Sequence, residues 1–183
     1  MRILVYGMQS SGASLFTFWL AQQPGRVGVV DLWNEHPAPE LAGLDDVVLK
    51  AVVTETYSLE THLRAFRPDV TVLFLRDRKA NRSSLDKKDY RDGGGSMDAK
   101  FDILDRLTYK FDHVVKYEDF VVGSEKVRSL PFVNEWSCGF YRSKYDVLGY
   151  NVERSRWCRD NYLSKWGFGG IRVSVEGKVE SVS

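Results

Sequence analysis

A glycine-bounded segment near the amino terminus has the composition of an anion-binding loop. It runs from Gly7 to Ser14 (GMQSSGAS) and matches the GxxxxGK(S/T) spacing of phosphate-binding loops, with Ala13 at the lysine position. Glycines let the backbone curl, so that successive N–H groups and the amino end of a following helix converge on an oxyanion. Such a loop binds phosphate without a lysine, but efficient group transfer then needs another cation. The alternative is that the glycines only form a tight turn between a strand and a helix.

A second segment combines cations with a hydroxyl. Arg76 follows the apolar run 70–75, and Ser84 stands eight residues further on. Arginine offers a fork of N–H donors and serine a hydroxyl, and this pair suits a terminal phosphate. The sequence therefore predicts a second anion site. Because the overall charge is balanced and gives no broad positive field, any such site has to be local.

The order and spacing of three segments within residues 1–120 resemble the sulfotransferase family, which uses 3′-phosphoadenosine 5′-phosphosulfate (PAPS) on a P-loop-like α/β fold. The third segment is residues 117–119 (YED), after another apolar run. The resemblance implies that Arg76 and Ser84 bind the 3′-phosphate of PAPS and that Tyr117 lies near the adenine. It also implies that the 5′-phosphosulfate is bound by Ser10, Ser11, Gly12, Ala13 and Ser14.

The loop departs from this family at its cation. Where the family has a catalytic lysine or arginine that stabilises the departing phosphate, this chain has Ser10. Loss of one such donor typically raises the barrier by about 3 kcal/mol. Arg78, Lys79 and Arg82 are the nearest substitutes in the sequence.

The general base of the family is also replaced. Many members have a histidine two residues after a lysine, and the comparable position here is Val52. Glu55 is the first substitute as catalytic base, and His36 or Glu35 in the preceding polar loop is the second. The alternative is that these are ordinary solvated loop residues.

The C-terminal third offers weaker motifs. The family's R-K-G-x-x-G segment has a rough counterpart in residues 164–170, so Lys165 is expected to cover the cofactor as part of a lid. The C-terminal third also has many aromatic residues, which are typical of irregular helices packed on a sheet, or of a cleft that binds the acceptor. The tail, residues 172–182, is expected either to form a small hairpin or to remain loose.

The elements that must position these residues alternate along the chain. Apolar runs predict strands, and segments of helical periodicity separate them. This alternation predicts an α/β fold of three layers, P-loop-like, with a mainly parallel central sheet and helices on both faces. We expect one sulfotransferase-like domain over residues 1–183. The predicted strands are residues 2–7, 27–31, 47–53, 70–75 and 113–117, and the predicted helices are residues 14–23, 58–66, a short segment after Arg76, and 97–111.

Composition excludes several classes of function. The chain has 183 residues, with 26 basic and 25 acidic side chains and a net charge of +1, which argues against nucleic-acid or membrane adhesion. No apolar run approaches the roughly 18 to 20 residues of a membrane span, so we expect a soluble, cytoplasmic protein. The two cysteines, Cys138 and Cys158, lack a CxxC arrangement, and no metal site is predicted.

These observations favour a PAPS-dependent sulfotransferase that acts on a hydroxyl or amine. The acceptor is not specified by the sequence, and a carbohydrate, a peptide or a carrier-bound small molecule each suits a short chain with an open site. One alternative is a weak or inactive nucleotide-binding protein of the same fold. The other is a P-loop nucleotide kinase, which Ala13 disfavours and for which Asp31 is the only plausible magnesium ligand.

Overall fold

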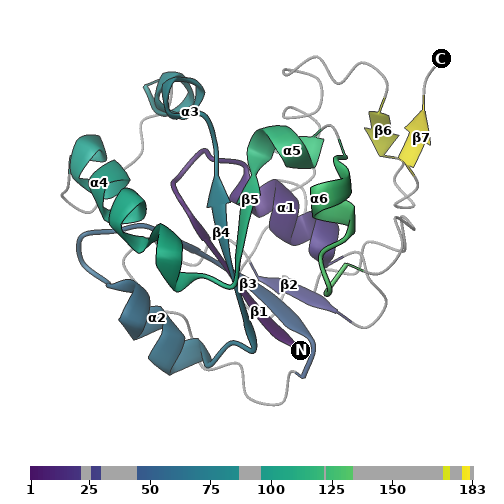
Figure 1. The fold of residues 1–183 in the computed structure, drawn as a ribbon, viewed down its shortest axis with the longest axis horizontal. Coiled ribbons are helices and arrows are strands. Elements are labelled where there is room, and N and C mark those ends of the chain that lie inside the picture. Colours follow the sequence, from purple (N-terminus) through teal and green to yellow (C-terminus); the bar gives the residue numbers. More distant parts are fainter. Residues whose placement is uncertain are drawn as a thin grey trace.

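A parallel β-sheet forms the centre of the molecule (Figure 1). The computed structural model describes residues 1–21, 26–29, 45–86, 96–121, 123–133, 171–173 and 179–181. Within these residues, a five-stranded sheet has the order β2-β3-β1-β4-β5, with every neighbouring pair parallel. Its strands are β1 (Arg2–Gly7), β2 (Val27–Val29), β3 (Val47–Val52), β4 (Val70–Leu75) and β5 (His113–Lys116).

The inner strands consist mainly of apolar residues, as expected for strands that are covered on both faces. In β1, every residue from Ile3 to Gly7 is buried, and its partners in β3 are buried except Lys50. The register pairs Leu4 with Leu49 on one side and with Thr71 on the other. Continuous apolar runs of this kind are typical of parallel strands enclosed between helical layers.

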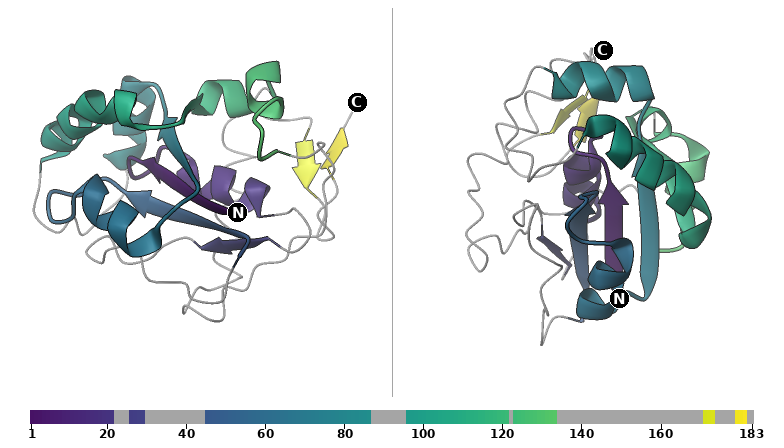
Figure 2. Two further views of the ribbon diagram at one scale, coloured as in Figure 1. Left: turned by 60° about the horizontal axis from the view of Figure 1, so that its bottom comes forward. Right: turned by 90° about the vertical axis from the view of Figure 1, so that its left-hand side faces the viewer.

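Helices cover the two faces separately (Figures 1 and 2). One face packs against α2 and α4 through Leu59, Phe66, Phe101 and Leu104, and the other packs against α1 through Phe16 and Leu20 and against α5 and α6. The α/β fold with a parallel sheet and helices on both faces is therefore confirmed. The helices are α1 (Ala13–Leu20), α2 (Leu59–Phe66), α3 (Arg78–Leu85), α4 (Met97–Leu107), α5 (Tyr117–Val121) and α6 (Glu125–Arg128), with a 3₁₀ turn at Thr108–Lys110.

Several element boundaries differ from the prediction. The first helix, predicted over 14–23, begins at Ala13 and ends at Leu20. Tyr117 opens α5 instead of ending the fifth strand, and the helix predicted over 97–111 gives way to the 3₁₀ turn after Leu107. In the tail, β6 (Ile171–Val173) pairs with β7 (Val179–Ser181) as an antiparallel hairpin. The aromatic-rich segment before it lies outside the described residues. None of the helices in the described ranges is long and apolar enough to cross a membrane.

The topology singles out the carboxyl end of β1. The chain leaves β1 toward β2 and β3 on one side, and it later crosses to β4 and β5 on the other side. In open parallel sheets, ligands bind at the carboxyl edge where the strand order reverses in this way. The loop predicted to bind an anion begins at this edge, directly after Gly7.

Candidate functional site

The loop between β1 and α1 has an unusual backbone. Ser10 has φ 58° and Gly12 has φ 95°, so both lie in the left-handed region. The N–H of Ser11 donates to the carbonyl of Met8 at 3.2 Å, which closes a turn just before Gly12. A left-handed residue other than glycine costs about 1–2 kcal/mol, and such strain is often found at functional sites.

The loop leads directly into the amino end of α1. Gly12 is the N-cap, and as a glycine it has no side chain that could cap the helix. The first intrahelical bond runs from the N–H of Phe16 to the carbonyl of Gly12 at 3.1 Å, and the N–H of Ala13 donates to Ser11 Oγ at 3.4 Å. The early N–H groups of such a helix end, with the positive end of its dipole, suit a negatively charged ligand.

Arg76 lies beside this loop. It follows β4, and its side chain is 8% exposed. Its Nη1 donates to the carbonyl oxygen of Ser10 at 2.8 Å. The structure thus brings Arg76 against the loop at one sheet edge, where its guanidinium contacts loop backbone. Its predicted role as a phosphate ligand stays a prediction.

Tyr117 packs against both Arg76 and the loop. Its ring lies under the guanidinium, with Arg76 Cζ 4.7 Å from the ring centroid. On the other side, a Cβ on Gly12 would stand 2.5 Å from Tyr117 Cδ2, so only glycine fits there. Tyr117 is 4% exposed, and in this arrangement its ring packs on protein groups. Its predicted place near an adenine remains untested.

Two residues that the sequence analysis did not single out complete the loop's surroundings. Asn81 on α3 is 1% exposed, and its Nδ2 donates to the carbonyl oxygen of Gln9 at 2.8 Å. Gln9 is itself 4% exposed, and its side-chain amide has no hydrogen-bond partner among the described residues. The sequence carries no local signal for Asn81, because most residues of α3 (RKANRSSL) are polar and its partner is distant in the chain.

Carboxylates stabilise the turn that carries Arg76. Asp77 caps α3 by accepting a hydrogen bond from the N–H of Ala80 at 2.9 Å. The N–H of Asp77 donates to Glu118 Oε1, also at 2.9 Å. These bonds tie the end of β4 to α3 and to α5, so Arg76 and Tyr117 are held against the loop from both sides.

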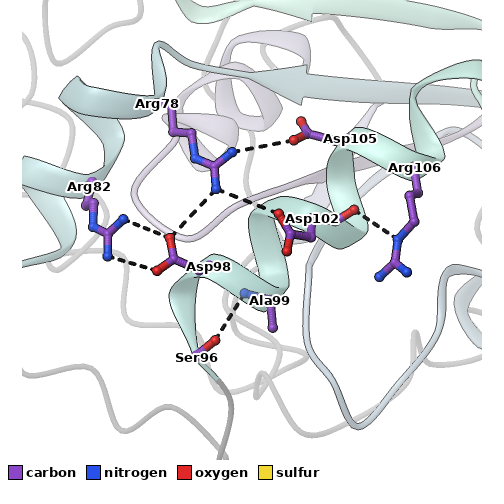
Figure 3. Close-up of polar contacts among 8 residues, drawn as sticks. All are labelled: Arg78, Arg82, Ser96, Asp98, Ala99, Asp102, Asp105 and Arg106. Atoms are coloured by element: carbon purple, nitrogen blue, oxygen red, sulfur yellow. Dashed lines mark hydrogen bonds and ion pairs between the residues drawn. The ribbon is translucent and has the colours of Figure 1, made fainter.

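The proposed substitutes for the loop cation point elsewhere (Figure 3). Arg82 makes a two-point ion pair with Asp98 on α4, with nitrogen–oxygen distances of 2.8 and 3.2 Å. Arg78 stacks on Phe101 and lies 3.5–3.8 Å from the carboxylates of Asp98, Asp102 and Asp105. The Arg82 guanidinium lowers the pKa of Asp98, so this carboxylate stays charged. Lys79, the third candidate, is exposed on α3.

The other predicted site residues are placed only in part. The N–H of Val53 donates to the carbonyl of Gly7 at 3.1 Å, so Glu55, two residues later and exposed, lies at the same sheet edge as the loop. Ser84 is half-buried on α3, one turn beyond Asn81 and on the same side of the helix. His36 and Lys165 lie outside the described residues.

No group of metal-ligating side chains occurs in the ranges that the structure describes. The side chains gathered at the loop include the buried guanidinium of Arg76 and the two buried amides of Gln9 and Asn81.

In comparisons with known proteins, neither a protein-family model nor a curated protein matches this chain. The resemblance to sulfotransferases stays a prediction that rests on the motifs.

Proposed function

We propose that this protein binds a phosphorylated nucleotide at the carboxyl end of β1 and uses PAPS as a sulfuryl donor. The observation that carries this proposal is the convergence, at one sheet edge, of the left-handed loop, the amino end of α1 and Arg76. A helix amino end that follows a loop with a buried amide, that of Gln9, without a partner among the described residues suits an anionic ligand with further polar groups. On this view the fold is P-loop-like.

The proposed reaction is the transfer of a sulfuryl group to a hydroxyl or amine of a carbohydrate, a peptide or a carrier-bound small molecule. The acceptor atom forms a bond to sulfur, the bond from sulfur to the 5′-phosphate oxygen breaks, and the electron pair leaves with the phosphate. The acceptor's proton passes to a base, for which Glu55 is the candidate at this edge. The loop N–H groups stabilise the charge that builds on the departing phosphate.

Nucleotide binding with little or no turnover is the second candidate function. It is favoured by the ion pairs of Arg78 and Arg82, which direct these cations toward α4. Ser10 leaves the loop without its own charge, and of the three substitutes only Lys79 is exposed and absent from the ion-pair cluster. Without a cation at the leaving group, the same site binds a nucleotide but transfers its sulfuryl group slowly.

Thermal unfolding in the presence of nucleotides tests the binding site. A ligand at 100 times its dissociation constant adds about 2.7 kcal/mol to stability, which for this size of chain is a shift of roughly 5–10 °C. We expect a shift with 3′-phosphoadenosine 5′-phosphate and not with adenosine 5′-phosphate. A shift only with ATP or GTP and magnesium would instead support a nucleotide kinase, and no shift with any nucleotide would refute the proposal.

Turnover then separates the enzyme from the binding protein. The chain is incubated with PAPS carrying a ³⁵S label and with sets of carbohydrate, peptide and carrier-bound acceptors. Transfer that is lost in Glu55→Gln, while the nucleotide still raises the melting temperature of this variant, identifies Glu55 as the base. Transfer that is kept in Glu55→Gln removes it from the mechanism. Binding without transfer to any acceptor supports the second candidate.

A further inference from the structure

We propose that Asn81 is a positioning residue that sets the direction of the Ser10 N–H group in the loop, and so determines how tightly the loop holds an anion. The inference rests on the proposed function, because it concerns the same loop. Asn81 is on α3, while the loop lies between β1 and α1, more than sixty residues earlier in the chain. The hydrogen bond between Asn81 and the loop is therefore a tertiary contact, and through it a change in α3 affects the loop.

Two consecutive loop carbonyls are held by side chains of one segment. Asn81 Nδ2 donates to the Gln9 carbonyl and Arg76 Nη1 donates to the Ser10 carbonyl, each at 2.8 Å. Both donors are buried, with 1% of Asn81 and 8% of Arg76 exposed. Arg76 and Asn81 thus hold two neighbouring peptide groups of the loop.

The direction of a carbonyl fixes the direction of the next N–H group. In a trans peptide, the C=O of one residue and the N–H of the following residue point in opposite directions. When Asn81 holds the Gln9 carbonyl toward α3, the N–H of Ser10 points away from α3. Carbonyl oxygens carry partial negative charge and would repel an anion if they pointed into the loop. The hydrogen bonds from Asn81 and Arg76 keep the carbonyl oxygens of Gln9 and Ser10 directed away from the loop's interior.

Asn81 suits this role because it is neutral and enclosed. With 1% of its surface exposed, it is not available to a ligand, and it adds no charge to the site. Its removal therefore changes anion binding only through the loop. Arg76 is less informative for this question, since its positive charge would attract an anion directly.

The test replaces Asn81 by a side chain of the same size that has no donor. Asn81→Leu is compared with the wild-type protein and with Ser83→Leu, which places the same side chain at an exposed position on α3. Dissociation constants for inorganic pyrophosphate and for 3′-phosphoadenosine 5′-phosphate are measured by calorimetry well below the unfolding temperature. We expect Asn81→Leu to weaken both about tenfold, and Ser83→Leu to leave both unchanged.

Stability separates positioning from a merely structural role. A buried polar group replaced by an apolar one of similar shape can leave the stability nearly unchanged, so the affinity of Asn81→Leu is expected to fall even if its melting temperature does not. Amide hydrogen exchange of Ser10 and Ser11 is expected to be faster in this variant without ligand. Asn81→Ser, whose hydroxyl leaves room for a bridging water, is expected to recover part of the affinity, and it replaces Asn81→Leu if that variant does not fold.

The outcomes distinguish the two proposals. If the wild-type protein binds the nucleotide and Asn81→Leu binds it equally well with unchanged exchange, the positioning role is wrong and the nucleotide site stands. If the wild-type protein binds neither pyrophosphate nor nucleotide, the proposed function is wrong. In that case, unchanged amide exchange in Asn81→Leu would also show that Asn81 does not order the loop. Faster exchange would show that Asn81 orders the loop, but not for the binding of an anion.

Discussion

At the scale of single residues, Arg76 has a close structural counterpart at the other end of β1. Arg2 donates from Nε to the Phe66 carbonyl at 3.0 Å, and its Cζ lies 4.6 Å above the Phe66 ring. Arg76 makes the same kinds of contact with Ser10 and Tyr117. The two arginines therefore allow the contribution of Arg76 to ligand binding to be separated from its contribution to stability.

We expect Arg76→Ala to weaken the binding of 3′-phosphoadenosine 5′-phosphate by about 1.5–3 kcal/mol, the range for hydrogen bonds to charged groups. Arg2→Ala is the matched control. It removes a stacked arginine and a carbonyl contact at the amino end of β1, away from the loop, and is expected to change stability without changing affinity. Calorimetric titration of both variants measures this. An unchanged affinity in Arg76→Ala, or an equal loss in Arg2→Ala, contradicts the assignment.

Residue types and spacing predict the loop but not its tertiary contacts. The Gly7–Ser14 pattern predicted the location of the loop at the end of the first strand, because glycine spacing is a local signal. Asn81 could not be found in this way, since its partner Gln9 is distant in sequence. The contact between Tyr117 and Gly12 was hidden for the same reason, and a family motif indicated only that Tyr117 lies near the site.

At the scale of elements, the contact between α3 and α4 is made by charged side chains. Arg78 and Arg82 of α3 face a row of aspartates on α4 (Figure 3). From sequence alone, such a row is typical of a solvent-exposed helix face. The strands were predicted to within a few residues because their apolar runs are continuous, whereas this ion-pair contact has no local signature.

We expect Asp98→Asn to lower stability slightly at low salt and to have no effect at high salt. Asp98 is the shared partner of both arginines, and its pairs are exposed to solvent, so salt screens them. Urea unfolding at about 0.05 M and about 1 M sodium chloride measures the difference, with the Debye length falling to about 3 Å at the higher value. Asp45→Asn, an exposed change before β3 and outside α3 and α4, is the control. A deficit of equal size at both salt concentrations would show that charge is not the cause.

At the scale of the whole molecule, stability depends on a histidine buried beside the central strand. His62 of α2 is 4% exposed and lies 6.0 Å from the ring of Tyr6 of β1. Burial lowers the pKa of His62 in the folded protein. The unfolded chain therefore binds a proton near pH 6.5, while the folded protein resists protonation, and the folded state loses stability as the pH falls below this value.

We expect the free energy of unfolding to decrease between about pH 7.5 and about pH 5.5, with a limiting slope near 1.4 kcal/mol per pH unit. His62→Gln is expected to show a smaller decrease, as measured by urea unfolding across this range. Asp112, whose pKa is lowered by hydrogen bonds from Thr71, loses its contribution only at more acidic pH and does not interfere. Identical slopes in both proteins would exclude His62 as the cause.

The strand order also has a consequence for how the chain folds as it is synthesised. Of the five strands of this sheet, the central strand β1 is made before the others, but its partners are residues 47–52 and 70–74, so it forms none of its sheet hydrogen bonds until these later segments have emerged. Contacts between such distant segments slow folding, and an apolar strand that waits for its neighbours is exposed to aggregation. The residues that lead into the loop are thus made first and enclosed late, once β3 and β4 have arrived on both sides.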